Sequence, residues 1–391
     1  MNKDKLQQAI IQNIFERPGR LSFLFGSGCS VCAGYPMMPA LTKSVVERLN
    51  DEEREMILRI REMQGGSRND LMTPTKLHIE SHLSELVDIA SILQRRNTLE
   101  SHNPYLLNGI GKAEPISISH DAATQLINNI KSLICEELDK KPTTLKHHTN
   151  FVRSVHQAIR DGKHEGRGPI DYYSLNYDPL LEHALALCSI SYCDGMMGGR
   201  TGHWAPETLE DGHRISPQAR LFKLHGSIDW KNNKDTRLPL RLSDKFTSEE
   251  CGISLTEEVL IHPASTKYKE TQDDPFAYMF KRFRENLSRR GPHTVYIMGY
   301  SFGDEHVNRI LSDAITYSNS SDLFFIIFSG DDALPAPLLA WSQSPHIQQR
   351  VLIINKSQVY SKDEEINCPY DNTLYKFEEI SELLFSGALT T

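Results

Sequence analysis

Short apolar runs alternate with amphipathic segments along most of the 391-residue chain. Runs of this length between turn residues predict strands that are buried on both faces, as in a parallel sheet. These strands are predicted at residues 21–25, 169–178, 220–226, 258–263, 294–299, 322–328 and 351–355. Apolar residues at helical spacing predict helices between several of them, at residues 180–187, 276–287 and 304–317. The alternation predicts an α/β, Rossmann-like fold with a mostly parallel sheet.

A predominantly helical pattern interrupts this alternation at residues 42–165. Helices are predicted there over residues 41–64, 77–96, 117–138 and 144–159, with no convincing strand among them. We therefore expect a Rossmann domain made of residues 1–41 and 166–391, with residues 42–165 as a large helical insertion. The insertion could serve as an oligomer contact, as a lid over a pocket or as an ordinary helical cap.

Three other segments have simpler patterns. Residues 1–19 are expected to form an amphipathic helix that ends at Pro18-Gly19. Residues 194–217 are rich in glycine, histidine and proline and are expected to form a surface loop. The chain closes with an amphipathic stretch at residues 376–384.

Composition narrows the possible partners. A net charge of −8 and a pI near 6.1 argue against a broad basic face for nucleic acid. Residues 281–290 (KRFRENLSRR) form the one local basic candidate, and their spacing also suits the solvated face of a helix. Contact with nucleic acid is therefore expected only indirectly, through a partner.

The cysteines and the first residues bear on metal content and location. Seven cysteines scattered through a long chain do not make a disulfide framework, and only Cys29 and Cys32 form a CxxC pair, so we expect no metal site. The opening residues are polar, and no apolar run approaches the roughly 20 residues of a membrane span. We expect a cytoplasmic protein with no membrane contact.

Four predicted strand ends carry unusual polar residues. They are GSGCS (26–30), SLNYD (174–178), KLHGS (223–227) and GYSFGDEHVN (299–308). Ligands of open parallel sheets bind outside the carboxyl ends of the strands, so these four segments are the candidates for a shared site.

Each segment also has a purely structural interpretation. Gly26 and Gly28 could bring backbone N–H groups against a pyrophosphate, or could simply make a tight turn. Asn176 could hold a water or a ribose hydroxyl, and Asp178 could accept a hydrogen bond from a ligand, while both could instead form an Asx turn before the next helix. His225 could act as a general base, since imidazole titrates near neutral pH, or could be a hydrogen-bonded structural histidine.

The last segment, GYSFGDEHVN, also has both a ligand-binding and a structural interpretation. Gly299, Ser301 and Gly303 repeat the logic of the first glycine turn. Asp304 is a candidate N-cap for the helix that follows, so part of this motif is expected to be structural.

Taken together, the four segments resemble the sirtuin fold family, and in particular the bacterial sirtuin-like NAD-hydrolysing proteins of anti-phage defence. The resemblance covers about residues 21–330. It implies a parallel sheet of the sirtuin type, catalytic roles for Asn176 and His225, and NAD⁺ as the substrate. It also implies contacts to NAD⁺ from Gly26, Ser27, Gly28, Ser30, Pro36, Asp178, Gly226, Ser227, Gly299, Tyr300, Ser301, Gly303, Asp304 and His306. Ser329 and Gly330 are a weaker correspondence, near the adenosine.

The sequence departs from the deacetylating members of that family. It has no second CxxC pair for their structural zinc, GYPMMPA (34–40) lacks the Asp and Arg of their corresponding segment, and Leu175 replaces their Gln. The resemblance therefore implies hydrolysis of NAD⁺ to ADP-ribose and nicotinamide. An NAD-dependent protein deacylase and a non-catalytic NAD or ADP-ribose sensor stay open as alternatives, and a nuclease component has no acidic cluster to support it.

The resemblance also implies a partner. Sirtuin-like proteins of this length resemble those that assemble as large homo-oligomers with a HerA-type ATPase. An NADase must be restrained in its own host, and few residues follow the last predicted strand, so the trigger is expected to come from another chain.

Overall fold

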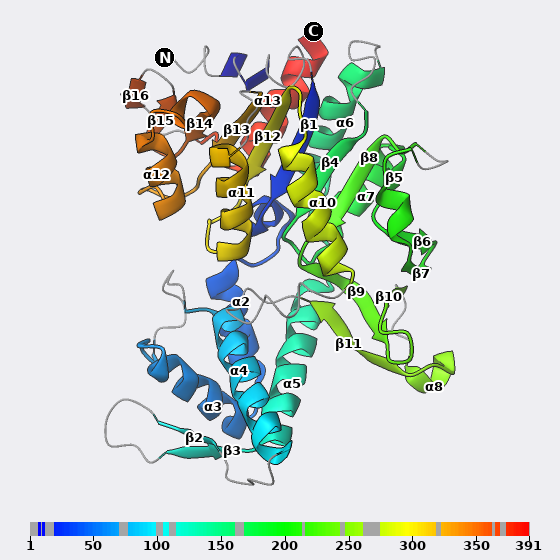
Figure 1. Ribbon diagram of the computed structural model, residues 1–391, viewed down its shortest axis with the longest axis vertical. Helices are drawn as coiled ribbons and strands as arrows, with labels where there is room; N and C mark the ends of the chain where they lie inside the picture. Colours follow the sequence, from blue (N-terminus) through cyan, green and yellow to red (C-terminus); the bar gives the residue numbers. More distant parts are fainter. Residues whose placement is uncertain are drawn as a thin grey trace. The chain divides into compact units, whose positions relative to one another are not determined.

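The computed structural model describes residues 7, 8, 10, 11, 19–69, 77–98, 105–108, 115–160, 168–212, 216–242, 247–260, 274–317, 322–361, 364–367 and 373–390. The chain divides into two compact units (Figure 1). The first consists of Met1–Tyr35, Pro142–Leu224 and Ala277–Thr391, and the second of Pro36–Lys141 and His225–Phe276. Each unit is described by itself.

The first unit is built on a sheet with the strand order β16-β15-β14-β13-β12-β1-β4-β8-β5. Its strands are β1 (Arg20–Phe25), β4 (Ile170–Ser174), β5 (Tyr192–Cys193), β8 (Ala219–Lys223), β12 (His293–Met298), β13 (Leu323–Phe328), β14 (Val351–Ile354), β15 (Gln358–Ser361) and β16 (Glu364–Asn367). Neighbours from β14 to β5 run parallel, and β15 and β16 are added antiparallel at one edge. The predicted α/β, Rossmann-like fold with a mostly parallel sheet is confirmed.

Helices cover both faces of this sheet. They are α6 (Lys146–Arg160), α7 (Leu180–Leu187), α10 (Phe276–Ser288), α11 (Glu305–Tyr317), α12 (Ala336–Gln343) and α13 (Phe377–Thr390), with the 3-10 helices η1 (Ser27–Ala33) and η3 (Gln348–Arg350). One face packs against α6 and α13, which also contact each other, and the opposite face is covered by α10, α11 and α12 (Figure 1). Because both faces are buried, the strands of this sheet are rich in apolar and aromatic residues, and β13 and β14 contain no others.

Aromatic side chains fill the core behind β1. Phe23 stacks on Tyr172 at a centroid distance of 5.5 Å and meets Phe151 of α6 edge-on at 5.0 Å. Phe25 contacts Phe377 of α13 edge-on at 5.8 Å. The amphipathic stretch predicted near the end of the chain is therefore part of this core, because Phe377 of α13 packs into it.

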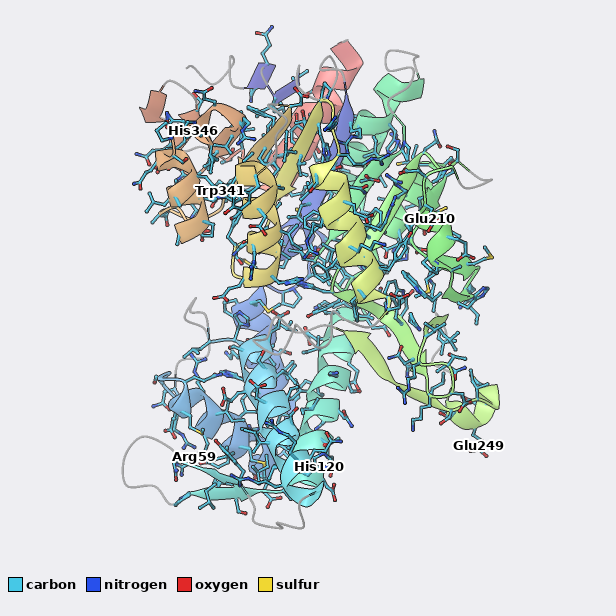
Figure 2. The ribbon with its side chains drawn as sticks, in the orientation of Figure 1. Arg59, His120, Glu210, Glu249, Trp341 and His346 are labelled. Atoms are coloured by element: carbon cyan, nitrogen blue, oxygen red, sulfur yellow. The ribbon has the colours of Figure 1, made fainter. Side chains whose placement is uncertain are left out.

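On the opposite face, Trp341 of α12 is only 3 % exposed and contacts Phe302 and Phe325 (Figure 2). Tyr173 of β4 lies on this face too, 4.5 Å between ring centroids from Phe283 of α10.

The segment predicted as a surface loop, residues 194–217, is more structured than expected. It contains the hairpin β6 (Met196–Gly198) and β7 (Thr201–Trp204) and the 3-10 helix η2 (Pro206–Leu209). Trp204 and Leu209 are buried, so the prediction of a surface loop was wrong for this part. Glycine and proline here mark tight turns between short elements, and the composition alone does not distinguish these from a long loop.

The second unit is a helical bundle with a small antiparallel sheet. Its elements are α2 (Met38–Arg48), α3 (Asp51–Met63), α4 (Ile79–Thr98), β2 (Tyr105–Leu107), β3 (Ile116–Ile118), α5 (His120–Leu138), β9 (Gly226–Asn233), β10 (Pro239–Leu242), α8 (Ser248–Cys251) and β11 (Leu255–Leu260). The helices α2 to α5 pack on one another, and β9 pairs with both β10 and β11. Arg59 of α3 is buried in this unit and pairs with Glu55 and Glu62 (Figure 2).

Two features of this unit differ from the sequence expectation. The β2–β3 hairpin lies inside the block predicted to have no strand, so that part of the prediction was wrong. The single helix predicted over residues 41–64 is two helices, because Asn50 accepts a hydrogen bond from Glu53 N and caps α3.

The compact units also divide the chain at places other than the predicted insertion. The second unit begins at Pro36, ends its first part at Lys141 and takes in residues 225–276. The helix expected over residues 144–159 packs with α13 and α7 in the first unit. The role of residues 42–165 as a single insertion stays a prediction.

Candidate functional site at the carboxyl ends of the strands

The strand order changes direction at β1. From β1 the chain continues to β4 and β8 on one side, while β12, β13 and β14 follow on the other. In open parallel sheets a ligand binds where the strand order reverses, outside the carboxyl ends. Here that point lies between β1 and β12, and it is where GSGCS and GYSFGDEHVN leave the sheet.

The two glycine turns at this point pack backbone against backbone. Gly28 N donates to Gly299 O at 2.9 Å, and a Cβ on Gly26 would lie 2.4 Å from that same carbonyl oxygen. Gly299 has a φ of +62°, and a Cβ there would lie 2.5 Å from Cys29 N. The glycines are therefore required for the close approach of the two turns, whatever they also bind.

This packing uses backbone donors that a pyrophosphate could otherwise take. Gly26 N donates to Met298 O, Gly28 N to Gly299 O and Cys29 N to Gly26 O, at 2.9, 2.9 and 3.0 Å. Contacts from this turn to a pyrophosphate would have to come from other groups. Among the predicted residues, half-buried Ser27 is the candidate.

Asn176 follows β4 and reaches across to the first turn. Its Nδ2 donates to Gly26 O at 3.0 Å and to Ser30 Oγ at 2.9 Å. Because a carbonyl oxygen can only accept, this contact fixes which end of the amide faces the turn. Its Oδ1 is buried and has no hydrogen-bond partner among the residues that the structure describes. Asn176 therefore presents an oriented acceptor.

Ser30 and Asp178 hold Asn176 in that orientation. Ser30 Oγ donates to Asp178 Oδ2 at 2.7 Å, so it accepts from Asn176. Asp178 Oδ1 accepts from Leu180 N at 3.2 Å, which is the turn-capping contact expected of an Asp before a helix. All three side chains are buried. Asp178 therefore has the structural contact that the sequence left open, and it also supports Ser30.

Lys223, the last residue of β8, is a residue of this region that the sequence interpretation missed. It is 1 % exposed, its Nζ donates to the backbone carbonyl of Asp178, and it lies 3.3 Å from Glu182 Oε1 of α7. A lysine in the otherwise apolar run LFKL was a signal that could have found it.

The loop after β12 is held by its own side chains. Tyr300 Oη lies 2.9 Å from Asn308 Oδ1 and 3.0 Å from Asp304 O, and Asn308 Nδ2 donates to Phe302 O. Phe302 has a φ of +57°, which is rare for a residue with a side chain.

The end of this loop begins a helix. Asp304 Oδ1 accepts from His306 N at 2.9 Å and from Val307 N at 3.3 Å, so the predicted N-cap of α11 is confirmed. The His306 ring meets Phe280 edge-on. Ser301 and Gly303 are exposed.

Burial keeps three titratable groups near the GSGCS turn and Asp178 uncharged at neutral pH. Burial raises the pKa of the Cys29 thiol well above its usual range and that of Cys32 to about 12, so neither is a ready thiolate. Burial also lowers the pKa of His148 in α6 to about 4, although Asp178 acts in the opposite direction. In the described residues, no group of three or more His, Cys, Asp or Glu side chains could hold a metal ion.

His225, Gly226, Ser227 and Pro36 belong to the second unit. His225 and Ser227 are 5 % and 1 % exposed, and Gly226 has a φ of +87° at the start of β9. Pro36 is half-buried. Their roles toward NAD⁺ stay predictions.

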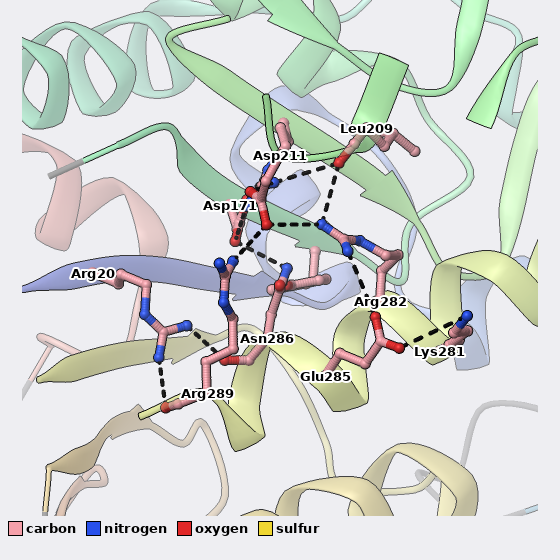
Figure 3. Close-up of polar contacts among 11 residues, drawn as sticks. Arg20, Asp171, Leu209, Asp211, Lys281, Arg282, Glu285, Asn286 and Arg289 are labelled. Atoms are coloured by element: carbon pink, nitrogen blue, oxygen red, sulfur yellow. Dashed lines mark hydrogen bonds and ion pairs between the residues drawn. The ribbon is translucent and has the colours of Figure 1, made fainter. Parts of the chain in front are cut away.

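A second polar cluster lies at the amino ends of the strands (Figure 3). Arg220 of β8 donates to both oxygens of Asp171 in β4, at 2.6 and 3.0 Å, and to Asp211 at 2.6 Å. Asp211 also accepts from Arg289 at 2.8 Å. Burial would lower the pKa of Arg220, but Asp171 and Asp211 outweigh it and raise that pKa.

The same cluster includes part of the basic segment 281–290. Arg282 lies 3.5 Å from Asp211 and 3.6 Å from Glu285, and Lys281 lies 3.8 Å from Glu285 (Figure 3). Asn286 Nδ2 donates to Asp171 Oδ2 at 3.1 Å. These contacts are intramolecular, so this segment ties α10 to the sheet.

Comparison with known proteins finds one family model that matches part of the chain. Residues 171–348 match the family model described as the SIR2-like domain. The match supports a sirtuin-like family and an NAD-related activity. It includes three of the four polar strand ends, at β4, β8 and β12, and begins after the GSGCS turn. No curated protein matches the chain. Within the described residues, no helix is long and apolar enough to cross a membrane.

Proposed function

We propose that this chain hydrolyses NAD⁺ at the nicotinamide–ribose bond and releases nicotinamide and ADP-ribose. The observation that carries the proposal is Asn176 Oδ1, which has no partner within the described part of the chain, is fixed in direction and lies at the carboxyl end of β4. Buried polar atoms are rarely left unpaired in proteins, so this oxygen favours a ligand or a water that donates to it. The SIR2-like match supports NAD⁺ as that ligand.

Asn176 can act only as an acceptor, because both of its N–H groups are used by Gly26 and Ser30. An acceptor holds a water through one of the water's protons and leaves a lone pair free to attack. The same acceptor could instead hold a ribose hydroxyl. Cleavage builds positive charge on the ribose, so a water held in line with the leaving group lowers the barrier chiefly through positioning.

We propose His225 as the general base, as the resemblance to sirtuins implies. A base that takes a proton from the attacking water, or from a ribose hydroxyl, contributes typically 10²- to 10⁴-fold to a rate. Loss of either Asn176 or His225 should therefore nearly abolish turnover while the first-unit fold is retained.

We further propose that the protein works in anti-phage defence as an NAD-depleting effector, assembled as a large homo-oligomer and gated by a HerA-type ATPase. The support for this is the resemblance in sequence, and residues 42–165 are the candidate contact region. Light scattering of the chain alone and mixed with the ATPase tests it, and a strict monomer in both samples would refute the assembly.

Chromatography of NAD⁺ and its products tests the proposed activity. The chain is incubated with NAD⁺, with and without an acetylated peptide and with and without the ATPase. Nicotinamide with ADP-ribose is the expected result. O-acetyl-ADP-ribose formed only with the peptide would indicate a deacylase instead, and intact NAD⁺ in every sample, together with measurable NAD⁺ binding, would indicate a sensor.

Two variants and one control sharpen the assay. His225→Ala and Asn176→Ala should each lose at least 100-fold in kcat. His203→Ala, at an exposed position of β7, is the matched control and should turn over as the unmodified chain does. Full activity of His225→Ala would overturn the assignment of the base.

A further inference from the structure

Lys223 is a charged group buried where a charge is expensive. Its side chain is 1 % exposed at the end of a strand whose other residues are also buried. Burying an ammonium group costs several kcal/mol even when it is paired, and replacing a whole buried ion pair by well-packed apolar residues is often neutral or stabilising. Stability alone therefore gives no reason for a Lys223–Glu182 pair at this position.

The contacts of Lys223 point to the turn that carries Asn176. Its Nζ donates to Asp178 O, and Glu182 Oε1 lies 3.3 Å away. In the sheet Lys223 pairs with Ser174, and Leu224 N donates to Ser174 O at 2.9 Å. The end of β8 thus holds the turn of residues 174–178 at its first residue through the backbone and at its last residue through the lysine.

The two ends of that turn determine where Asn176 lies. Asp178 supports Ser30 through its carboxylate, and Ser30 accepts from Asn176. A shift of Asp178 is therefore transmitted to the amide whose oxygen is left free. Hydrogen bonds to a charged donor are about twice as strong as neutral ones, which suits a lysine to fix a single carbonyl.

We propose that Lys223 is a positioning residue for the reaction: it fixes the turn of residues 174–178 through Asp178 O, with Glu182 holding the ammonium group, so that Asn176 Oδ1 keeps its direction. The proposal rests on the proposed hydrolysis of NAD⁺ for its kinetic consequence. The fixing of the turn itself is a property of the chain alone and is measured separately.

The test compares Lys223→Met, Lys223→Arg and Glu182→Gln with the matched control Lys281→Met, whose lysine is 68 % exposed and pairs with Glu285. Lys223→Met should lose about 10- to 100-fold in kcat, since a misplacement of about 1 Å can cost 100-fold, with KM changed less than about threefold. Lys223→Arg keeps a charged donor and should recover part of the loss. Glu182→Gln should lose less than Lys223→Met, and the control should lose nothing.

Hydrogen exchange supplies the readout that does not depend on activity. The backbone amides of residues 176–178, 180 and 181 should exchange at least about tenfold faster in Lys223→Met, with amides of β1 and β12 unchanged. Unchanged exchange in the turn would overturn the proposal, and so would a kcat loss that follows the fraction of unfolded protein. If Lys223→Met does not fold, Lys223→Arg and Glu182→Gln are measured in the same way.

Failure of the proposed function and failure of the proposed role of Lys223 give different results. If the unmodified chain leaves NAD⁺ intact, the proposed function fails, while faster exchange in Lys223→Met would still support the fixing of the turn. If the unmodified chain hydrolyses NAD⁺ and Lys223→Met matches it in both kcat and exchange, only the role of Lys223 fails.

Discussion

The amino ends and the carboxyl ends of the strands in the central sheet use polar residues in opposite ways. At the amino ends, Asp171, Arg220 and Asp211 form a network of charges that satisfy one another (Figure 3). At the carboxyl ends of β1 and β4, neutral side chains and backbone groups form a directed series from Asn176 through Ser30 to Asp178. The charged groups of the first network pair with one another, and the second series ends in Asn176 Oδ1, which has no partner among the described residues.

One pair of residues makes the comparison sharper. Asn286 at the amino ends donates both N–H groups, to Asp171 Oδ2 and Tyr173 Oη. Its Oδ1 is buried and, like that of Asn176, has no partner in the described ranges. A lone oxygen is therefore not enough to mark a site. The difference lies in the surroundings, because Asn176 lies beside two glycine turns at the point where the strand order reverses.

The largest effect is expected at the amino ends, on stability. Arg220→Met leaves Asp171 buried without its cation, so the free energy of unfolding should fall by about 3–5 kcal/mol in chemical denaturation. Turnover per folded molecule should not change. Arg289→Met is the control, because its side chain is 45 % exposed and an exposed pair contributes about 0–1 kcal/mol. A folded but inactive Arg220→Met would contradict a purely structural role for the cluster at the amino ends of the strands.

The next effect is on activity, at the carboxyl ends. Asn176→Ala should lower kcat at least about 100-fold, since it removes the oriented acceptor. Asn286→Ala also removes a buried amide and should lower stability by about 1–3 kcal/mol with kcat unchanged. Steady-state kinetics and denaturation of both variants test this difference. Equal kcat losses would contradict a catalytic role for the carboxyl ends and a structural role for the amino ends of the strands.

A smaller loss is expected from the residue that supports Asn176. Ser30→Ala should lower kcat about tenfold, because Asn176 keeps its bond to Gly26 O but loses the one to Ser30 Oγ. Ser22→Ala is the matched control, because Ser22 is a buried serine of β1, the strand before η1, and its Oγ lies 2.8 Å from His293 Nε2. An equal kcat loss in Ser22→Ala would show that the loss is not specific to Ser30.

The last comparison concerns the pH dependence of stability. Burial lowers the pKa of His148 in α6 to about 4 and that of His293, at the amino end of β12, to about 3, from a usual value of 6.5. Between those values the unfolded chain binds more protons than the native one, so the free energy of unfolding should fall as the pH drops below about 6.5.

Each histidine contributes a slope of at most about 1.4 kcal/mol per pH unit. His148→Gln and His293→Gln should each flatten the dependence measured by denaturation between pH 4 and pH 7. The two slopes should be alike, because burial is the main cause at both places. A variant as steep as the unmodified chain would rule out that histidine as a source.

Local patterns predicted the elements and the N-cap at Asp304, because these depend on near neighbours in the sequence. They failed where tertiary packing decides. The short strands β6 and β7 lie in a segment whose composition resembles a loop, and the β2–β3 hairpin lies in a region dominated by helical periodicity. Strands of three or four residues give almost no periodic signal, so long-range contacts determine them.

The candidate site was predicted in part. The sequence singled out Asn176, Asp178 and Ser30, and the structure joins them by hydrogen bonds. It did not single out Lys223, although the apolar run around it indicated burial, because the carbonyl and carboxylate that Lys223 contacts lie about 40 residues earlier in the chain. Nor did it indicate that the glycines of the two turns face each other, since residues about 270 positions apart show no joint pattern in one sequence.

The sequence by itself determined the α/β class and the polar residues at the strand ends, because apolar period and turn chemistry are local properties. Only the tertiary structure decided which atoms remain available. It assigned the N–H groups of Gly26 and Gly28 to carbonyls of the neighbouring strand's end, and both N–H groups of Asn176 to the first turn. Hydrogen bonds form between groups that are close in space. Because both N–H groups of Asn176 have partners in the folded chain, its amide is left with an acceptor only.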